Sequence, residues 1–458
     1  MSESVWQRWP EAEALIEEGL AGFLAAHSHA RRLADAVTAQ ASTRLFDWLG
    51  YLILGTDPAL RARIDEAGFV TEDVEAPAGQ TVYHHPGAQL PRLVLQRNDL
   101  LAGQVTAIAV KADSVADFVL ARGIRAPIAG SPYSPYRVAT LWPEGGRRVL
   151  VEERRGYRGL HPQEQGGDYP ARYLAARDRW ANRLRVTDDD AGGMREALAL
   201  ACDMGRDMGP DMAAWIVFEV ERDYWQRRNW AGQVQKARQD RLGLGWGNHD
   251  HHTFRASRQH FAGLIATLEA LGFVCRERFY AGEAAGWGAQ VLEQPNCGLV
   301  VFADVDLSPE ERDGDFAHQG LPARQDLGTI GLWCALHGES ILGAGMHHLE
   351  AQFSFDSLRD DLAGLGVGMM RPFSEMPHLR QAFTTGERWP VAPARLARLL
   401  AAGQITQAQH DRFLAEGALG SHLENLQRRE GYKGFNQHNV STIIRATDPR
   451  LLAGTTVG

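Results

Sequence analysis

Hydrophobic and polar positions change their spacing several times along the chain. In residues 1–66, EALIEEGLAGFLAAH and STRLFDWLGYLIL place apolar residues three and four positions apart, which is the spacing of one helical face. This pattern predicts a helical cap over 1–66. Between 67 and 160, short apolar segments such as LPRLVLQ and QVTAIAV are divided by Gly and Pro, which indicates a module built mainly of strands.

Helical spacing returns in residues 161–245, where MREALALACDMG and PDMAAWIVFEVERDYW predict a helical linker or lid. From 246 onward the pattern reads strand, helix and three further strands, in the segments GNHDHHTFRAS, RQHFAGLIATLEALG, FVCRERFYAG, GWGAQVLEQP and GLVVFADVDL. A second strand and helix begin at GMHHLEAQFSFDSLRDDLAGLG, and strand-like HLRQAFTTGERW and SHLENLQRR come later. We therefore predict an α+β domain of paired βαβββ modules over 246–458, with helical additions.

The two halves of the chain contain similar segments. VEERRGYRGL at 151–160 resembles LQRREGYKGF at 426–435, which favours an internal duplication. The segment QVTAIAV would then take the place of the histidine-rich strand of the second half, but it contains no histidine. Glu152 or Glu153 is either a relic of an ancestral site or part of a site assembled differently.

Composition narrows the class of protein and its partners. A length of 458 residues exceeds one typical domain, and 44% hydrophobic with 23% charged residues is typical of a globular chain. A net charge of -9 offers no general basic surface, so we expect neither a nucleic-acid nor a membrane partner. The four cysteines form no CxxC pair that would indicate zinc or redox chemistry. No apolar run of about 18 residues and no basic leader occurs, which predicts a cytoplasmic protein.

Candidate chemistry lies in the strand GNHDHHTFR. Successive side chains of a strand alternate between its faces, so His251 and Arg255 share one side with His249 and Thr253. In the strand near 348 the same alternation places His348 on a wholly polar face with Glu350 and Gln352, and His347 on a mostly apolar one. His348 is therefore the better ligand candidate.

Glu424, in SHLENLQRRE, is the third candidate ligand. Two imidazoles and one carboxylate on one face of an octahedral metal are typical of mononuclear non-heme Fe(II) sites, because positions stay open for substrate and dioxygen. Arg255 would offer a planar fork to a substrate carboxylate. With 17 histidines in the chain, a surface or core position is the structural alternative for each ligand, and a plain ion pair is the alternative for Arg255.

These motifs, taken in order, resemble those of the 2-oxoadipate dioxygenase/decarboxylase family. DHHTFR at 250–255 and FADVDLSPEE at 302–311 resemble its first module, and GMHHLEAQF and HLRQAF resemble two strands of its second. HLENLQRR is similar to its carboxylate strand, and GYKGFNQHNVSTII to its closing substrate-contacting segment. The resemblance covers roughly 245–450 and implies the vicinal oxygen chelate fold, in which paired βαβββ modules curl around one metal.

The resemblance also implies a site and a reaction. Fe(II) would be held by His251, His348 and Glu424, Arg255 would bind a carboxylate, and His438 and Asn439 would face the substrate. The substrate, a small 2-oxo acid, would be oxidatively decarboxylated and hydroxylated by dioxygen to a 2-hydroxy acid. Residues 67–160 would be a degenerate vicinal oxygen chelate-like module.

Several positions depart from the family pattern. His347 stands where Asn is usual, Leu349 and Glu350 stand near the expected Thr, and His438 and Asn439 replace small or hydroxyl residues, so the substrate need not be 2-oxoadipate. Two other interpretations stay open. The first is a metal-dependent lyase, isomerase or hydrolase on the same fold, using the metal as a Lewis acid, and the second is a non-catalytic protein that binds a small carboxylate.

Overall fold

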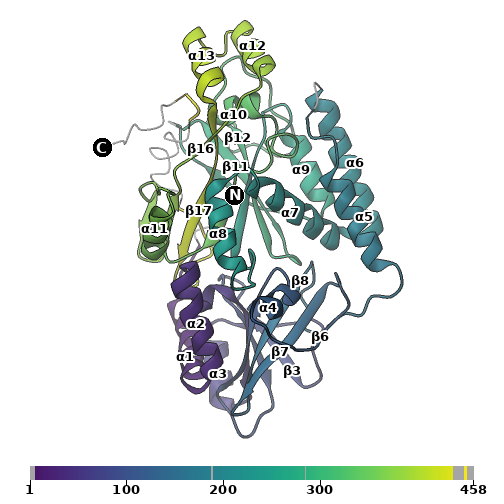
Figure 1. Cartoon of the computed structure of the whole chain (residues 1–458), viewed down its shortest axis with the longest axis vertical. Helices are drawn as coiled ribbons and strands as arrows, with labels where there is room; N and C mark the ends of the chain where they lie inside the picture. The colour runs from purple at the N-terminus through teal and green to yellow at the C-terminus, as the bar shows by residue number, and fades with distance from the viewer. Residues whose placement is uncertain (1–5, 187–188, 284, 437–447, 451–458) are drawn as a thin grey trace.

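The protein contains two large mixed sheets, here called sheet A and sheet B. The computed structural model describes residues 6–186, 189–283, 285–436 and 448–450. Figure 1 shows an elongated molecule with sheet A at one end and sheet B in the middle, and with α12 (Pro393–Ala401) and α13 (Gln407–Glu416) at the opposite end.

Sheet A is assembled from two βαβββ modules. The first module consists of β1 (Leu49–Gly55), α3 (Pro58–Glu66), β2 (Val70–Glu72), β3 (Gln80–His84) and β4 (Arg92–Gln96). The second consists of β5 (Val105–Lys111), α4 (Val115–Ala121), β6 (Ile128–Ala129), β7 (Tyr136–Glu144) and β8 (Arg147–Arg154). The strand order is β2-β3-β4-β1-β5-β8-β7-β6, so the modules join where β1 pairs with β5 in antiparallel fashion.

Sheet B repeats this plan. Its first module contains β9 (His249–Arg255), α9 (Phe261–Ala270), β10 (Val274–Tyr280), β11 (Trp287–Gln294) and β12 (Leu299–Asp306). Its second contains β13 (His348–Gln352), α11 (Phe355–Gly364), β14 (Ser374–Met376), β15 (Leu379–Phe383), β16 (Glu387–Trp389) and β17 (Ala418–Arg428). The order β10-β11-β12-β9-β13-β17-β15-β14, with β16 beside β17, again joins two modules through their first strands.

The two sheets therefore share one topology, with paired βαβββ modules in each. This arrangement confirms the predicted α+β class and the vicinal oxygen chelate fold, because each module contributes its strands in the same order and its first strand at the centre. The strand order also confirms that the chain contains a duplicated arrangement.

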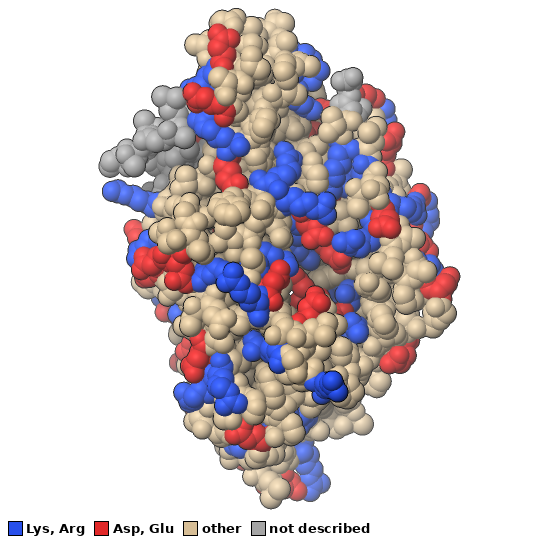
Figure 2. All heavy atoms as spheres, in the orientation of Figure 1, with Lys and Arg blue, Asp and Glu red and all other residues tan. Residues whose placement is uncertain are grey.

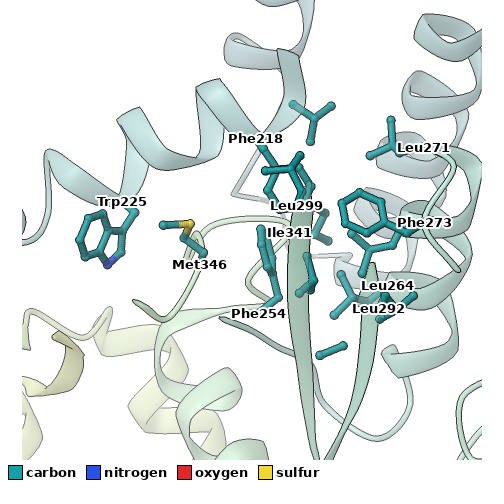
Figure 3. Packing of buried hydrophobic residues seen from close by; sticks show 14 of the residues in the cluster. Phe218, Trp225, Phe254, Leu264, Leu271, Phe273, Leu292, Leu299, Ile341 and Met346 are labelled. Atoms are coloured by element: carbon teal, nitrogen blue, oxygen red, sulfur yellow. The ribbon is translucent and has the colours of Figure 1, made fainter. Parts of the chain in front are cut away.

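Helices cover the outer faces of both sheets. Sheet A packs against α1 (Pro10–Ala26) and α2 (Ser28–Ala41) through a core that includes Leu52, Ile108 and Val149. Sheet B packs against α7 (Pro210–Gln226), α8 (Trp230–Asp240) and α9, and α5 (Tyr169–Ala181) and α6 (Asp190–Met208) pack on α7 and α9. Figure 3 shows Phe218 of α7 and Leu299 of β12 in this cluster, and the ring centroid of Phe218 lies 5.7 Å from that of Phe254.

Two segments differ from the sequence prediction in their structure or position. The segment LGYLILG, predicted as part of a helical cap, forms the central strand β1; the helical spacing is misleading because a strand buried on both faces is apolar at nearly every position. The segment 161–245 is helical, but α7 packs behind sheet B, on the side of Phe254 and Leu349. It therefore supports the sheet from outside and does not cover its inner face.

The inner face of sheet B is closed at one end by α10 (Thr329–His337). Trp333 of this helix donates from its indole Nε1 to the Gly420 carbonyl at 2.9 Å. Over the face in Figure 2, basic and acidic side chains are interspersed. Among the described helices, none combines the length and apolar character needed to cross a membrane.

Candidate metal centre

The candidate site lies on three neighbouring strands at the centre of sheet B. β9 pairs with β13 in antiparallel fashion, and β13 pairs with β17 in parallel fashion. In the parallel pair His348 lies beside His422, and Glu350 lies beside Glu424. Because residues two apart share a face, these four side chains form one histidine rung and one carboxylate rung directed toward the same space as His251.

Four buried side chains converge there. One ligand atom from each of His251, His348, Glu350 and Glu424 lies within 4.8 Å of the other three. His348 Nε2 is 3.3 Å from Glu350 Oε1 and 3.3 Å from Glu424 Oε2, and His251 Nε2 contacts Glu350 Oε2. Two imidazoles and two carboxylates within this distance form a donor set that a single divalent ion can bridge.

The structure thus brings together the three ligands predicted from the sequence. His251 comes from β9, His348 from β13 and Glu424 from β17, although about 173 residues separate the first from the last. Glu350 is a fourth candidate to which the sequence prediction gave no role. Its signal was present in the alternation of β13, which already placed it on the polar face with His348.

A second histidine group adjoins the first. One ring nitrogen each of His347, His348 and His422 also lies within 4.8 Å of the others, and His347 Nδ1 is 2.7 Å from His348 Nδ1. His422 is 1% exposed, and neither of its ring nitrogens has a hydrogen-bond partner among the described residues. His348 therefore presents Nε2 to the carboxylates and Nδ1 to a second imidazole.

The protonation states of the four clustered side chains are suited to binding a metal cation. Burial lowers the pKa of His251 to about 4 and that of His348 well below its usual range, so both rings are neutral near pH 7 and can donate a lone pair. Burial, together with the neighbouring Glu424, raises the pKa of Glu350 well above its usual range, and burial raises the pKa of Glu424 to about 8. Two carboxylates this close retain a proton unless a cation neutralises them, so the residues present fit a divalent metal.

Asp250 supports the first ligand from behind. Its Oδ1 is 3.2 Å from His251 Nδ1, and Arg428 reaches the same carboxylate with NH2 and Nε at 3.1 and 3.2 Å. Burial alone would raise the pKa of Asp250, but Arg428 and His251 hold it well below its usual range. A carboxylate on the far nitrogen of a metal-binding imidazole fixes the ring orientation and increases its basicity.

The Arg255 guanidinium near this centre is incompletely hydrogen-bonded among the described residues. Its side chain is buried, and its Nε and NH1 have no hydrogen-bond partner among the described residues. The nearest acid contact is Asp304 Oδ2, 3.8 Å from Nε, and burial raises the pKa of Asp304 to about 7. The Arg255 guanidinium also lies over the Trp333 ring, with its carbon 5.3 Å from the centroid. A buried, incompletely paired guanidinium is suited to an anionic group that enters the site.

Aromatic side chains form the wall beside His251. Its ring centroid lies 4.7 Å from that of Phe302 and 4.9 Å from that of Phe435, and Phe279 packs on Phe302 at 6.2 Å. On the other side, Phe383 lies 5.4 Å from His348. The donor atoms are therefore enclosed by apolar surface, which strengthens their electrostatic interactions by excluding water.

The remaining residues that the sequence singled out are His438, Asn439, Glu152 and Glu153. His438 and Asn439 fall outside the described residues, so their predicted contact with substrate stays a prediction. Glu152 forms an ion pair with Arg154 at 2.7 Å, and Glu153 pairs with Arg137 and Arg155. Both glutamates belong to sheet A and take no part in the described histidine and carboxylate groups of sheet B.

Comparison with known proteins gives no family assignment. No protein-family model and no curated protein matches the chain. Among solved structures, a triple mutant of 4-hydroxymandelate synthase from Streptomyces coelicolor is 14% identical, and the match covers 88% of this chain and 98% of that chain with a TM-score of 0.30. A xylose isomerase-like TIM barrel/4-hydroxyphenylpyruvate dioxygenase fusion protein is 11% identical, over 88% and 52% of the two chains, with a TM-score of 0.24.

Methylmalonyl-CoA epimerase from Mycobacterium tuberculosis is 12% identical, with 40% of this chain and 88% of that chain covered and a TM-score of 0.23. Such low TM-scores carry no argument about fold or function. The fold assignment accordingly rests on the strand order of the two sheets, and the functional argument on the residues of the site.

Proposed function

We propose that the protein is an Fe(II)-dependent dioxygenase that oxidatively decarboxylates and hydroxylates a small 2-oxo acid. The observation that carries the proposal is the convergence of His251, His348 and Glu424 on one buried point. Two neutral imidazoles and one carboxylate are the donor set of mononuclear non-heme Fe(II) centres that react with dioxygen. This proposal agrees with the reaction implied by the motif resemblance.

Each residue of the site has a defined role in the proposal. His251, His348 and Glu424 would hold the metal, and Asp250 would orient the imidazole of His251. Fe(II), when bound there, supplies the one-electron chemistry that allows dioxygen to react with the 2-oxo acid. Arg255 would bind a carboxylate of the substrate with its free N–H groups. The surrounding phenylalanines would exclude water from the reacting groups.

The overall reaction balances without a further reductant. The 2-oxo acid loses its carboxyl group as CO2, and one atom of dioxygen enters the carboxylate that replaces the oxo group. The other atom enters a hydroxyl group on the remaining chain. The two-electron oxidation of the 2-oxo acid and the two-electron hydroxylation together use the four oxidising equivalents of dioxygen.

Two features of the site favour different substrate side chains. Arg255 favours a second carboxylate on the substrate, as in a dicarboxylic 2-oxo acid, whereas the wall formed by Phe279, Phe302 and Phe435 favours an apolar or aromatic side chain. A substrate panel must therefore contain both kinds of 2-oxo acid.

Glu350 favours a second candidate function. If Glu350 joins the other three residues on one octahedral ion, only two positions remain, too few for a bidentate 2-oxo acid together with dioxygen. The metal would then act as a Lewis acid in a lyase, isomerase or hydrolase, and a carboxylate would move the substrate proton. The dioxygenase proposal requires Glu350 to stay off the metal during turnover.

The test is oxygen uptake by the anaerobically Fe(II)-loaded protein, measured with dicarboxylic, aliphatic and aromatic 2-oxo acids. We expect one substrate to give matched oxygen uptake and CO2 release that is lost in His348→Ala. Glu350→Gln should retain this uptake, since the dioxygenase proposal gives Glu350 no place on the metal.

Iron binding without uptake for any substrate would overturn the dioxygenase proposal. Metal-dependent conversion of a carboxylate without oxygen, lost in Glu350→Gln, would then establish the Lewis-acid alternative. Binding of a carboxylate without conversion would establish a non-catalytic binding protein.

A further inference from the structure

A separate cavity lies where sheet A meets sheet B. Its volume is about 540 Å³, and both sheets line it, which is within the usual size of small-molecule sites. None of the four clustered donor residues of the metal centre is among its lining residues. The cations that line it are Arg92, Lys111, Arg154, Arg158, Arg276 and Lys433.

Most of the charges around the cavity already have partners. Glu152 pairs with Arg154 at 2.7 Å, and Glu293 pairs with Arg276 and Lys433 at 3.3 and 3.4 Å. Asp250 is held by Arg428. The lining acids are therefore largely neutralised by neighbouring cations, and any further cation adds uncompensated positive charge to the cavity.

Lys111 is such a cation. It ends β5 on the cavity wall, and among the described residues its ammonium has neither a hydrogen-bond partner nor an ion-pair partner within 4 Å. Burial lowers its pKa, even though Glu152, Asp47 and Asp250 lie close enough to favour its charged form. Because Lys111 is half-buried, its ammonium keeps only part of its hydration, and an anion in the space in front of it would supply a compensating bond.

The backbone beside Lys111 leaves room for this arrangement. Gly50 lies on β1 next to β5, and a Cβ at this position would collide with Glu152 Oε1 and approach Lys111 Cγ to 3.4 Å. Gly50 also lines the cavity. A larger residue there would displace the side chains that define the cationic wall.

One cavity residue contacts the metal centre. Asp250 Oδ2 accepts hydrogen bonds from Gln89 Nε2 at 2.7 Å and from Gln352 Nε2 at 3.0 Å, while Oδ1 lies 3.2 Å from His251 Nδ1. Gln89 precedes β4 of sheet A, and Gln352 ends β13 of sheet B. Asp250, Gln89 and Gln352 line the cavity, whereas His251 does not. A ligand that shifts either amide therefore changes the support of a candidate metal ligand.

We propose that this cavity is a regulatory site for a small anion bearing carboxylate or phosphate groups, with Lys111 as its principal cation. The bound anion alters metal affinity through Gln89 and Asp250. The existence of the anion site is independent of the proposed function, whereas its coupling rests on the metal centre of that proposal.

The binding test is calorimetry on the full-length, Fe(II)-loaded chain under anaerobic conditions, at constant ionic strength. The probes are succinate and glycerol 3-phosphate, which separate a carboxylate ligand from a phosphorylated one. We expect at least one probe to bind, with about tenfold or more weaker affinity in Lys111→Met. Lys111→Arg should retain binding because it keeps the charge, and Lys236→Met, which removes a cation paired with Asp240 on α8, should bind like the wild type.

Two outcomes would overturn the anion site. The first is that neither probe binds, in which case water alone hydrates the Lys111 ammonium. The second is that Lys111→Met binds a probe as tightly as the wild type, in which case the probe occupies the metal centre or another surface. Preference for succinate or for glycerol 3-phosphate identifies the ligand chemistry and supports the site in either case.

The coupling test compares Fe(II) affinity with and without a saturating probe. We expect a change of about fivefold or more in the wild type and none in Gln89→Leu, which still binds the probe. Equal Fe(II) affinities in the wild type would overturn the coupling. None of these measurements involves turnover, so a failure of the proposed oxygenase reaction leaves their result unaffected.

Discussion

The inner faces of sheets A and B have the same strand order but different chemistry at their centres. On sheet A the central strands present Tyr51, Ala107, Ala109 and Leu150, which pack into an apolar cluster. Lys111 and Glu152 lie on the same face, nearer the cavity between the sheets. On sheet B the corresponding strands present His251, His348, Glu350 and Glu424. The topology thus supplies an enclosed concave surface, and the residues on its inward positions decide whether that surface becomes a core or a centre of chemistry.

The two faces also differ in what they contribute to stability. Burying apolar side chains stabilises sheet A, whereas buried carboxylates and unpaired rings in sheet B oppose folding until a cation binds. Sheet B compensates on its outer face, where α7, α8 and α9 pack against it. We therefore expect mutations on the two inner faces to affect different properties.

The largest effect is expected for His348→Ala. Loss of one ligand imidazole should weaken divalent metal binding by about 1,000-fold or more, beyond the 10- to 100-fold typical when a supporting residue is removed. Metal titration of the purified variant, followed by calorimetry, measures this change. His337→Ala removes a half-buried ring whose hydrogen bond among the described residues is to the Leu419 carbonyl, and this variant should bind metal normally. Wild-type affinity in His348→Ala would show that the metal lies elsewhere.

On sheet A, Ile53→Ala should change stability without changing metal binding. Ile53 is 2% exposed in the apolar inner cluster, and truncation of a buried Ile typically lowers the free energy of unfolding by about 2–5 kcal/mol. Urea denaturation and metal titration on the same variant measure both quantities. A large loss of metal affinity would contradict the separation of the two faces.

Arg255→Met should weaken substrate binding and leave metal binding intact. A charge-assisted hydrogen bond to a carboxylate contributes about 1.5–3 kcal/mol, which corresponds to a KM roughly 10- to 150-fold higher. Because the Arg255 guanidinium is buried with free N–H groups, the variant should also be more stable than the wild type without substrate. Arg258→Met, which breaks an ion pair with Glu311, serves as the matched control. Unchanged KM and lower stability would make Arg255 a structural residue.

The smallest predicted effect is on the pH dependence of the metal-free protein. The unfolded chain releases the Glu424 proton near pH 4.5, whereas the folded protein retains it until about pH 8 because the carboxyl is buried. Between these values Glu424 binds more proton in the folded state than in the unfolded state, so its contribution to the free energy of unfolding falls as pH rises. Buried histidines with a lowered pKa act in the opposite direction, so the wild type is compared with a variant that keeps them. Burial and the neighbouring Glu424 also raise the pKa of Glu350, so Glu350→Gln removes a second carboxyl that contributes to this fall and should make the fall smaller. Denaturation at pH 5 and pH 8 measures the difference, and identical slopes would contradict it.

Much of sheet B was predictable because its strands alternate polar and apolar residues. The alternation of β13 selected His348 over His347, and the motif order placed His251 and Glu424 in the same domain. β1 was mistaken for a helix, since a strand covered on both faces gives no two-residue period. The packing of α7 behind sheet B was also not predictable, because an apolar helical face does not identify its partner.

The role of Glu350 depends on three-dimensional proximity that spacing could not supply. Its position on the polar face of β13 followed from alternation, but its contact with His251 depends on the pairing of β13 with β9. The cavity around Lys111 was likewise beyond sequence analysis, because its walls come from both sheets.

The parallel pairing of β13 with β17 makes the site sensitive to changes in chain length. His348 lies beside His422 and Glu350 beside Glu424. Leu349 separates His348 from Glu350, Leu423 separates His422 from Glu424, and both leucines point into the core behind the sheet. Deleting one residue within either strand would exchange a carboxylate for a leucine at the centre and drive a charge into the core. Substitutions at these strands can therefore be gradual during evolution, whereas single-residue insertions and deletions should be excluded from them.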